Sequence, residues 1–166
     1  MLNYDYVTKD FIKTHEFAAD EFTPEHQSQS FMLRPNIDKL PPTYGDLKIE
    51  LRKKFSYIFG TRFKNSYASV EVRCQIKSDT MRSYLNGRRD ITFYAVAKFC
   101  VGAGLSIRDT YELFKLCGHI LAPNDYLLDA IIIDAINCHD DIENFYETCR
   151  SCKLDKKILD KLSYIC

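Results

Sequence analysis

Apolar side chains recur every three or four positions along most of this chain, which is the spacing of amphipathic α-helices. Between residues 43 and 105 the pattern predicts four short helices, at 44–59, at 67–74, at 78–85 and from Thr92 to the glycines at 102 and 104. Thr43 and Thr92 can cap the first and the last of them, and Gly60 and Asn86-Gly87 are expected to end two of them. The central part of the chain is therefore predicted to be a bundle of short helices.

Helical spacing continues on both sides of this central part. An amphipathic stripe over residues 4–22 predicts an N-terminal helix, and four prolines between residues 23 and 42 predict a linker after it. Further helices are expected from Ser106, from Pro123-Asn124, from His139 and over residues 155–164, and the second of these is apolar enough to be the core helix. No stretch has the period of a strand, so the predicted fold class is all-α, with parts at 1–42, 43–105 and 106–166.

The composition is that of a folded protein. The chain has 166 residues, of which 46% are hydrophobic and 28% charged, enough for one compact domain or two small ones. Its longest apolar run, at 130–133, is too short to cross a membrane, and the opening residues MLNYDYVTKDF lack the basic and apolar regions of an export signal. We therefore expect a cytoplasmic protein whose seven cysteines are reduced.

The formal net charge is zero, but the charges are unevenly distributed. Residues 44–100 contain twelve Lys or Arg and five Asp or Glu, whereas residues 1–43 contain four and seven, and residues 101–166 contain seven and eleven. A basic segment between acidic ones is typical of a module that binds a polyanion and has additional regions for protein contacts.

The stretch from Ile76 to Arg89 carries the most specific motif. It resembles the recognition helix and following turn of the xenobiotic-response-element type helix-turn-helix family, which has the lambda repressor/Cro-like fold. The matching residues are Ile76, Thr80, Met81, Tyr84, Leu85, Asn86, Gly87 and Arg88. The resemblance extends over about residues 43–154, and it implies a lambda repressor-like helical bundle with a C-terminal extension, a double-stranded DNA ligand and a homodimer.

In this interpretation the helix at 78–85 enters the major groove, and Met81, Tyr84 and Leu85 hold its apolar side against the preceding helix. The residues expected to read bases are Ser78, Asp79, Arg82 and Ser83, and those expected to hold the DNA backbone are Lys77, Arg88 and Arg89. Two positions depart from the family pattern. Glu71 stands where the family commonly has alanine, and Gln75 where it commonly has glycine, so a wider approach of the two helices or a shifted register is expected.

The main alternative is a non-catalytic module that keeps the helix-turn-helix fold for protein contacts, with the acidic C-terminal region as a further surface for a partner. A zinc site is a third hypothesis, since Cys149 and Cys152 are spaced as a pair and Cys117, His119, Cys138 and His139 precede them. A single such pair is weak evidence, and we assign no metal ligand. No phosphate-binding loop or hydrolase motif occurs, so we predict no enzyme activity and no cofactor.

Overall fold

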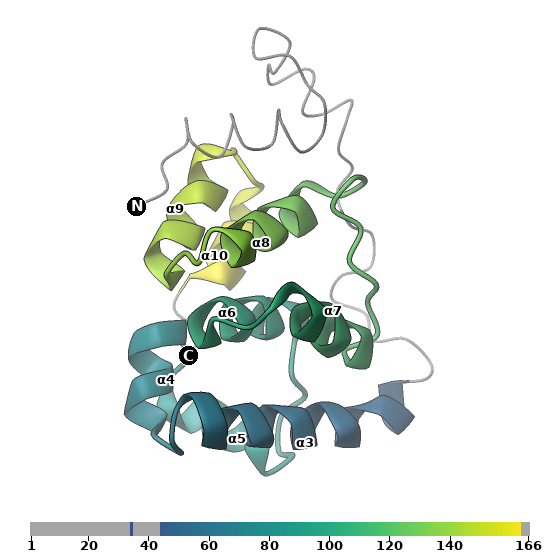
Figure 1. Cartoon of the computed structure of the whole chain (residues 1–166), viewed down its shortest axis with the longest axis vertical. Helices are drawn as coiled ribbons and strands as arrows, with labels where there is room; N and C mark the ends of the chain where they lie inside the picture. The colour runs from purple at the N-terminus through teal and green to yellow at the C-terminus, as the bar shows by residue number, and fades with distance from the viewer. Residues whose placement is uncertain (1–33, 35–43, 164–166) are drawn as a thin grey trace, which may run out of the picture.

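The computed structural model describes residue 34 and residues 44–163, and every regular element in this part of the chain is an α-helix (Figure 1). The eight helices are α3 (Tyr44–Arg62), α4 (Tyr67–Cys74), α5 (Ser78–Leu85), α6 (Phe93–Ala103), α7 (Ile107–Leu116), α8 (Leu127–Asn137), α9 (Ile142–Ser151) and α10 (Lys156–Leu162). The predicted all-α class is confirmed. The expected helix at 4–22, nearly all of the linker at 23–42, the Thr43 cap and Tyr164 lie outside the described residues.

The helices stack in tiers (Figure 1). Helices α3, α4 and α5 lie at one end, α6 and α7 cross the middle, and α8, α9 and α10 lie on the other side. Helix α6 contacts α4, α7, α8, α9 and α10, and each of its residues except Gly102 is buried. Helix α8, which we expected to be the core helix, is largely buried as well, but α6 is the helix on which the other tiers pack.

Side-chain caps set several helix starts, and the caps at Thr92 and Ser106 were predicted. The side chains of Thr92, Ser106, Asp141 and Asp155 accept backbone N–H groups at the starts of α6, α7, α9 and α10. Gly87 follows α5 with a φ of 79°, the left-handed conformation that glycine tolerates. These caps satisfy amides that would otherwise lack partners at the helix ends.

Four predicted boundaries are wrong. Helix α9 begins at Ile142 and not at His139, because His139 has a φ of 55° and Asp141 caps the helix. Helix α3 continues through Gly60 to Arg62, because the turn that ends it is made by the positive-φ residues Lys64 and Asn65. Gly102 lies inside α6, which ends at Gly104. Helix α8 begins at Leu127 and not at Pro123, because the amides of Asp125 and Tyr126 turn back to the carbonyl of Ala122.

At Gly102 the helices α4 and α6 lie close together. A Cβ atom at this position would lie 2.3 Å from the Cys74 sulfur and 2.5 Å from the carbonyl oxygen of Arg73. The end of α4 therefore rests on the α6 backbone, where a side chain cannot fit. This contact fixes α4, and the turn that follows it, relative to the rest of the bundle.

Among the helices of residues 44–163, none is both long enough and apolar enough to cross a bilayer.

Candidate nucleic-acid interface

Helices α4 and α5 are joined by a three-residue turn that holds them at a fixed angle. Ile76, in the middle of the turn, is fully buried, and Gln75 before it adopts the left-handed conformation with a φ of 55°. Gln75 is the C-cap residue of α4, and its backbone N–H donates to the carbonyl of Glu71.

Glu71 supplies a cap to α5 from seven residues upstream. Lys77 occupies the N-cap position of α5, but its side chain does not cap the helix. Instead, the backbone N–H of Ser78 donates to Glu71 Oε1 at 3.3 Å. The carboxylate also lies at the positive end of the α5 dipole. The departure from alanine at this position therefore gives the second helix a stabilising cap.

Helix α5 has one buried side and one exposed side. Met81 and Tyr84 are buried against the bundle, as expected, and Thr80 is buried with them, whereas Leu85 is only partly buried. The opposite side carries Asp79, whose side chain is 96% exposed, and Arg82, whose side chain is 54% exposed. A polyanion can therefore reach these two charges without displacing any described residue.

Arg82 is held by two neighbours on this exposed side. Its Nη1 atom donates to Asp79 Oδ1 at 2.9 Å, one helical turn earlier. Its guanidinium carbon lies 4.6 Å from the ring centroid of Tyr67, the first residue of α4. Tyr67 was not predicted from the sequence as a site residue. Its contact with Arg82 depends on how α4 and α5 cross.

The remaining predicted residues lie around this pair. Lys77 is exposed at the start of α5, and Ser78 and Ser83 are partly buried. Arg88 is exposed beyond the end of α5. Arg89 is exposed too, but its Nη1 atom donates to Thr80 Oγ1 at 3.3 Å, so its guanidinium bends back over α5. The structure thus brings the predicted residues to one end of the bundle, along α5 and the loop after it.

Helix α3 adds two basic residues to this surface, Lys48 and Arg52, which were not predicted as site residues. Lys48, Arg52 and Arg89 line one shallow hollow beside the end of α5. A Cβ atom on Gly87 would lie 2.6 Å from Arg52 Nη1, so the Arg52 side chain runs over the glycine. The four-residue spacing of Lys48 and Arg52 places them on one side of a helix, which is the signal that could have identified them.

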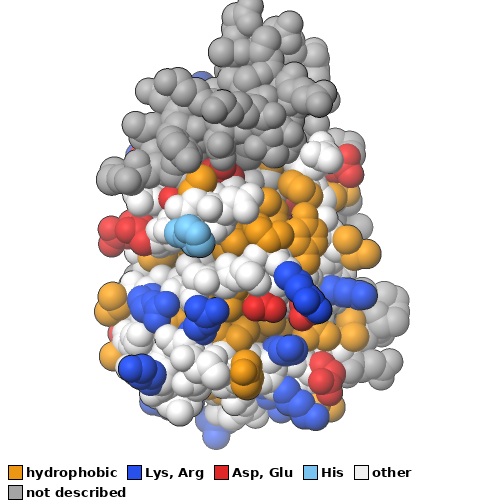
Figure 2. Space-filling model, in the orientation of Figure 1, with side chains coloured by type: hydrophobic (Ala, Val, Ile, Leu, Met, Phe, Trp, Pro, Cys, Tyr) orange, Lys and Arg blue, Asp and Glu red, His pale blue; other side chains and the backbone are white. Residues whose placement is uncertain are grey.

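Figure 2 shows the distribution of charge on one face of the molecule. Lys and Arg side chains gather over the half where Figure 1 places α3, α4 and α5, and few are seen over the half where α8 and α9 lie. On this face, the basic side chains therefore lie mainly over the helices of the basic segment 44–100.

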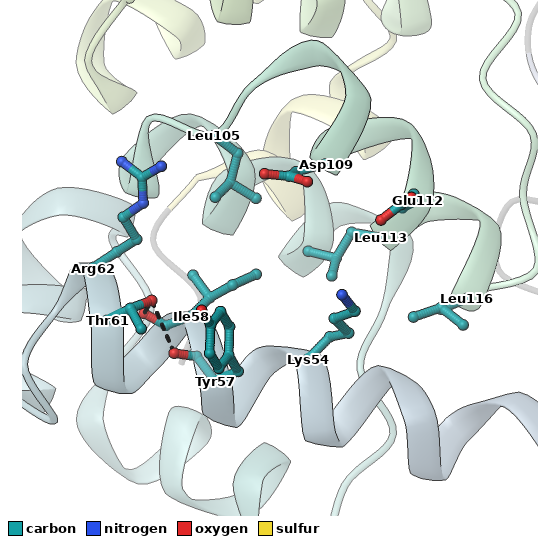
Figure 3. Close-up of a pocket in the computed structure, with 10 residues that line it drawn as sticks. All are labelled: Lys54, Tyr57, Ile58, Thr61, Arg62, Leu105, Asp109, Glu112, Leu113 and Leu116. Atoms are coloured by element: carbon teal, nitrogen blue, oxygen red, sulfur yellow. Dashed lines mark hydrogen bonds between the residues drawn. The ribbon is translucent and has the colours of Figure 1, made fainter.

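A pocket of about 260 Å³ lies between α3 and α7, apart from this surface (Figure 3). Its floor is apolar, with Ile58 and Leu113, and Lys54 from α3 points toward the wall formed by α7. It shares no lining residue with the hollow that contains Arg52 and Arg89. The pocket has no part in the candidate interface.

The cysteines of the described region behave as small apolar side chains. Cys149 and Cys152 are buried, and burial raises the pKa of the Cys152 thiol to about 12 and that of Cys149 well above its ordinary value. Cys117 is buried too, and burial raises the pKa of its thiol to about 12. Across residue 34 and residues 44–163, no group of three or more His, Cys, Asp or Glu side chains is placed to hold a metal ion.

No protein-family model, no curated protein and no solved structure matches this chain.

Proposed function

We propose that this protein is a sequence-specific, double-stranded DNA-binding transcriptional regulator, with a lambda repressor-like helix-turn-helix formed by α4 and α5. The observation that carries the proposal is the exposure of Asp79 and Arg82 on a helix whose other side is anchored by Met81 and Tyr84. A helix in the major groove needs this division, because base edges are read by projecting side chains while the body of the protein stays outside. An α-helix with its side chains is about 10–12 Å in diameter, which fits the major-groove width of about 12 Å.

Basic side chains on both sides of α5 supply the contacts to the DNA backbone. Lys77 lies at its start and Arg88 beyond its end, and Lys48 and Arg52 extend the basic surface along α3. Phosphate contacts position a protein on the duplex and account for most of its nonspecific affinity. In this arrangement Ser78, Asp79, Arg82 and Ser83 face the bases.

We also propose that the protein acts as a homodimer, because one short helix contacts few base pairs and regulators of this kind gain affinity from two half-sites. The acidic region of residues 101–166 is then free for contacts with a protein partner.

The proposal is tested by titrating the full chain onto fluorescently labelled random and genomic duplexes at several salt concentrations. We expect affinity to fall steeply with salt, and Arg82→Ala to weaken binding by about 1–3 kcal/mol and relax the base preference. Lys77→Ala should weaken binding to all sequences alike. Binding that is absent at low salt, or unchanged by both variants, contradicts the proposal.

Arg150→Ala is the matched control. Arg150 lies on α9 and pairs with Glu147 at 3.3 Å, with the same three-residue spacing as Asp79 and Arg82 and a similar exposure of 59%. Its removal changes the net charge by the same amount at the other end of the molecule (Figure 1). Arg82→Ala must therefore weaken binding much more than Arg150→Ala does.

One observation favours the alternative of a protein-interaction module. A hollow of about 430 Å³ is lined by Val72 and Arg73 on one side and by Asp140 and Glu143 on the other, and Val72 is 77% exposed. An apolar residue facing carboxylates suits a segment of a partner protein that is both apolar and basic. If the chain binds no DNA at low salt, this hollow is the candidate surface for a protein partner.

A further inference from the structure

Two contacts orient Arg82 on the exposed side of α5. Asp79 accepts one hydrogen bond from Nη1, and Tyr67 lies under the guanidinium at 4.6 Å. The Nε and Nη2 donors make no hydrogen bond to any described residue. The side chain is thus oriented by two contacts while donors remain available to a ligand.

We infer that Arg82 reads a guanine in the DNA site and that Tyr67 is the positioning residue that orients the Arg82 guanidinium for this contact. The inference rests on the proposed function and deepens it. Guanine presents two acceptors, O6 and N7, at its major-groove edge, and the planar fork of arginine can bond both at once. A preoriented fork loses less side-chain entropy on binding than a free one does.

Tyr67 can hold the arginine because its own ring is fixed. The ring centroid of Tyr67 lies 4.8 Å from that of Phe59, which is a buried core residue of α3. The ring face attracts a cation through its negative π-system. A line of contacts therefore runs from the core through Phe59 and Tyr67 to Arg82, and it crosses from α3 through α4 to α5.

Asp79 completes the arrangement. Its carboxylate would repel phosphates if it were alone on the exposed side of α5, but the Arg82 guanidinium at 2.9 Å offsets its charge. An ion pair of the same spacing on α9 lacks the aromatic contact. Arg150 pairs with Glu147 in the same way, but no ring of a described residue is found over it.

The test is a selection of bound duplexes from a randomised pool, with the full chain as bait and sequencing of the recovered DNA. We expect the wild-type chain to enrich a guanine at one position of the half-site. Arg82→Lys, which keeps the charge but not the fork, should lower the preference for guanine at that position by about ten-fold or more. Arg150→Lys is the control and should leave the enriched sequence unchanged.

The role of Tyr67 is tested by two further variants in the same selection. Tyr67→Leu removes the ring face and should lower the guanine preference about three-fold, whereas Tyr67→Phe keeps the ring and should retain the preference. Thermal melting followed by circular dichroism shows whether each variant is folded. If Tyr67→Leu is not, Tyr67→Phe and Arg82→Lys still decide the inference, since loss of the preference in Tyr67→Phe contradicts it.

The outcomes separate this inference from the proposed function. Guanine enrichment that survives Arg82→Lys overturns the inference and leaves DNA binding intact. Equal enrichment in a folded Tyr67→Leu overturns the positioning role of Tyr67. Failure of the wild-type chain to recover any DNA overturns the proposed function, and the inference with it.

Discussion

The Nζ atom of Lys98 donates a hydrogen bond of 3.0 Å to the carbonyl oxygen of Gln75, and Lys98 is fully buried in α6. Gln75 is the left-handed residue of the turn between α4 and α5. The same ammonium group donates to the carbonyl of Ser163, just after α10. One buried cation therefore links the turn that orients α5 to the C-terminal part of the bundle.

Because the carbonyls of Gln75 and Ser163 would lose a charged donor, we expect Lys98→Met to lower the free energy of unfolding by about 1–3 kcal/mol. Methionine keeps most of the side-chain volume, so the loss reports the hydrogen bonds and not a cavity. Urea unfolding followed by circular dichroism measures the change. Lys115→Met, at an exposed position of α7, is the control and should stay within about 0.5 kcal/mol of the wild type. A Lys98→Met chain as stable as the wild type would contradict this role.

A second buried charge joins distant parts of the sequence. Arg34 donates from Nε to Asp129 Oδ1 at 3.2 Å and from Nη2 to the carbonyl of Ile120 at 2.9 Å, and the Asp129 side chain is fully buried. Removing one member of such a pair leaves the other charged and buried. We expect Arg34→Ala to lower the free energy of unfolding by about 3–5 kcal/mol.

The control for Arg34 is an exposed pair. Lys53 and Glu50 on α3 are 3.5 Å apart, with side chains that are 70% and 58% exposed, so Lys53→Ala should cost less than about 1 kcal/mol. Chemical unfolding of both variants gives the comparison. Equal losses in the two would mean that the Arg34 pair contributes no more than a surface ion pair.

Two glycines inside helices should respond in opposite ways to the same substitution. A Cβ atom on Gly102 would meet Cys74 and the Arg73 backbone at under 3 Å, so Gly102→Ala is expected to lower the free energy of unfolding by about 1–3 kcal/mol or more. A Cβ atom on Gly60 would meet only the Asn65 side chain, at 3.5 Å. Gly60→Ala should therefore stabilise α3 by about 0.5–1 kcal/mol. Thermal melts of the two variants should move in opposite directions.

These glycines also show which features the sequence could predict. Both lie in the interior of a helix, and both were expected to end one, because glycine alone gives no information about the neighbouring helix. The caps at Thr92, Ser106 and Asp141 were predictable, since each acts on an amide three residues away. Apolar spacing likewise placed α4 and α5 with their observed bounds.

The missed features of the candidate interface depend on contacts between helices. At Glu71 the sequence predicted a wider approach of α4 and α5 or a shifted register, but it did not predict that the carboxylate caps α5. Tyr67 contacts Arg82 only because α4 crosses α5, and Arg52 reaches the surface only because α3 runs beside Gly87. A buried lysine such as Lys98 was not predictable from its place in an apolar helix, because its two carbonyl partners lie 23 and 65 residues away.

The last prediction concerns Asp140, before α9. Burial raises the pKa of the Asp140 carboxyl from 3.8 to about 6, and the charge of Asp141 adds to the effect. Its Oδ2 atom is buried with no hydrogen-bond partner among the described residues. Since the folded chain binds this proton more tightly than the unfolded chain does, the stability that the protonated group contributes is complete below about pH 4. That contribution is lost as the pH rises to about 6.

Asp140→Asn removes the titration, because the amide is neutral at every pH. The variant and the wild type should therefore be about equally stable near pH 4, and the variant should be more stable near pH 8, by about 1 kcal/mol once the partial exposure of Asp140 is allowed for. Urea unfolding at the two pH values measures the difference. A stabilisation of Asp140→Asn that is the same at both pH values would have a cause other than the charge of Asp140, since only the ionised carboxylate is destabilised by burial.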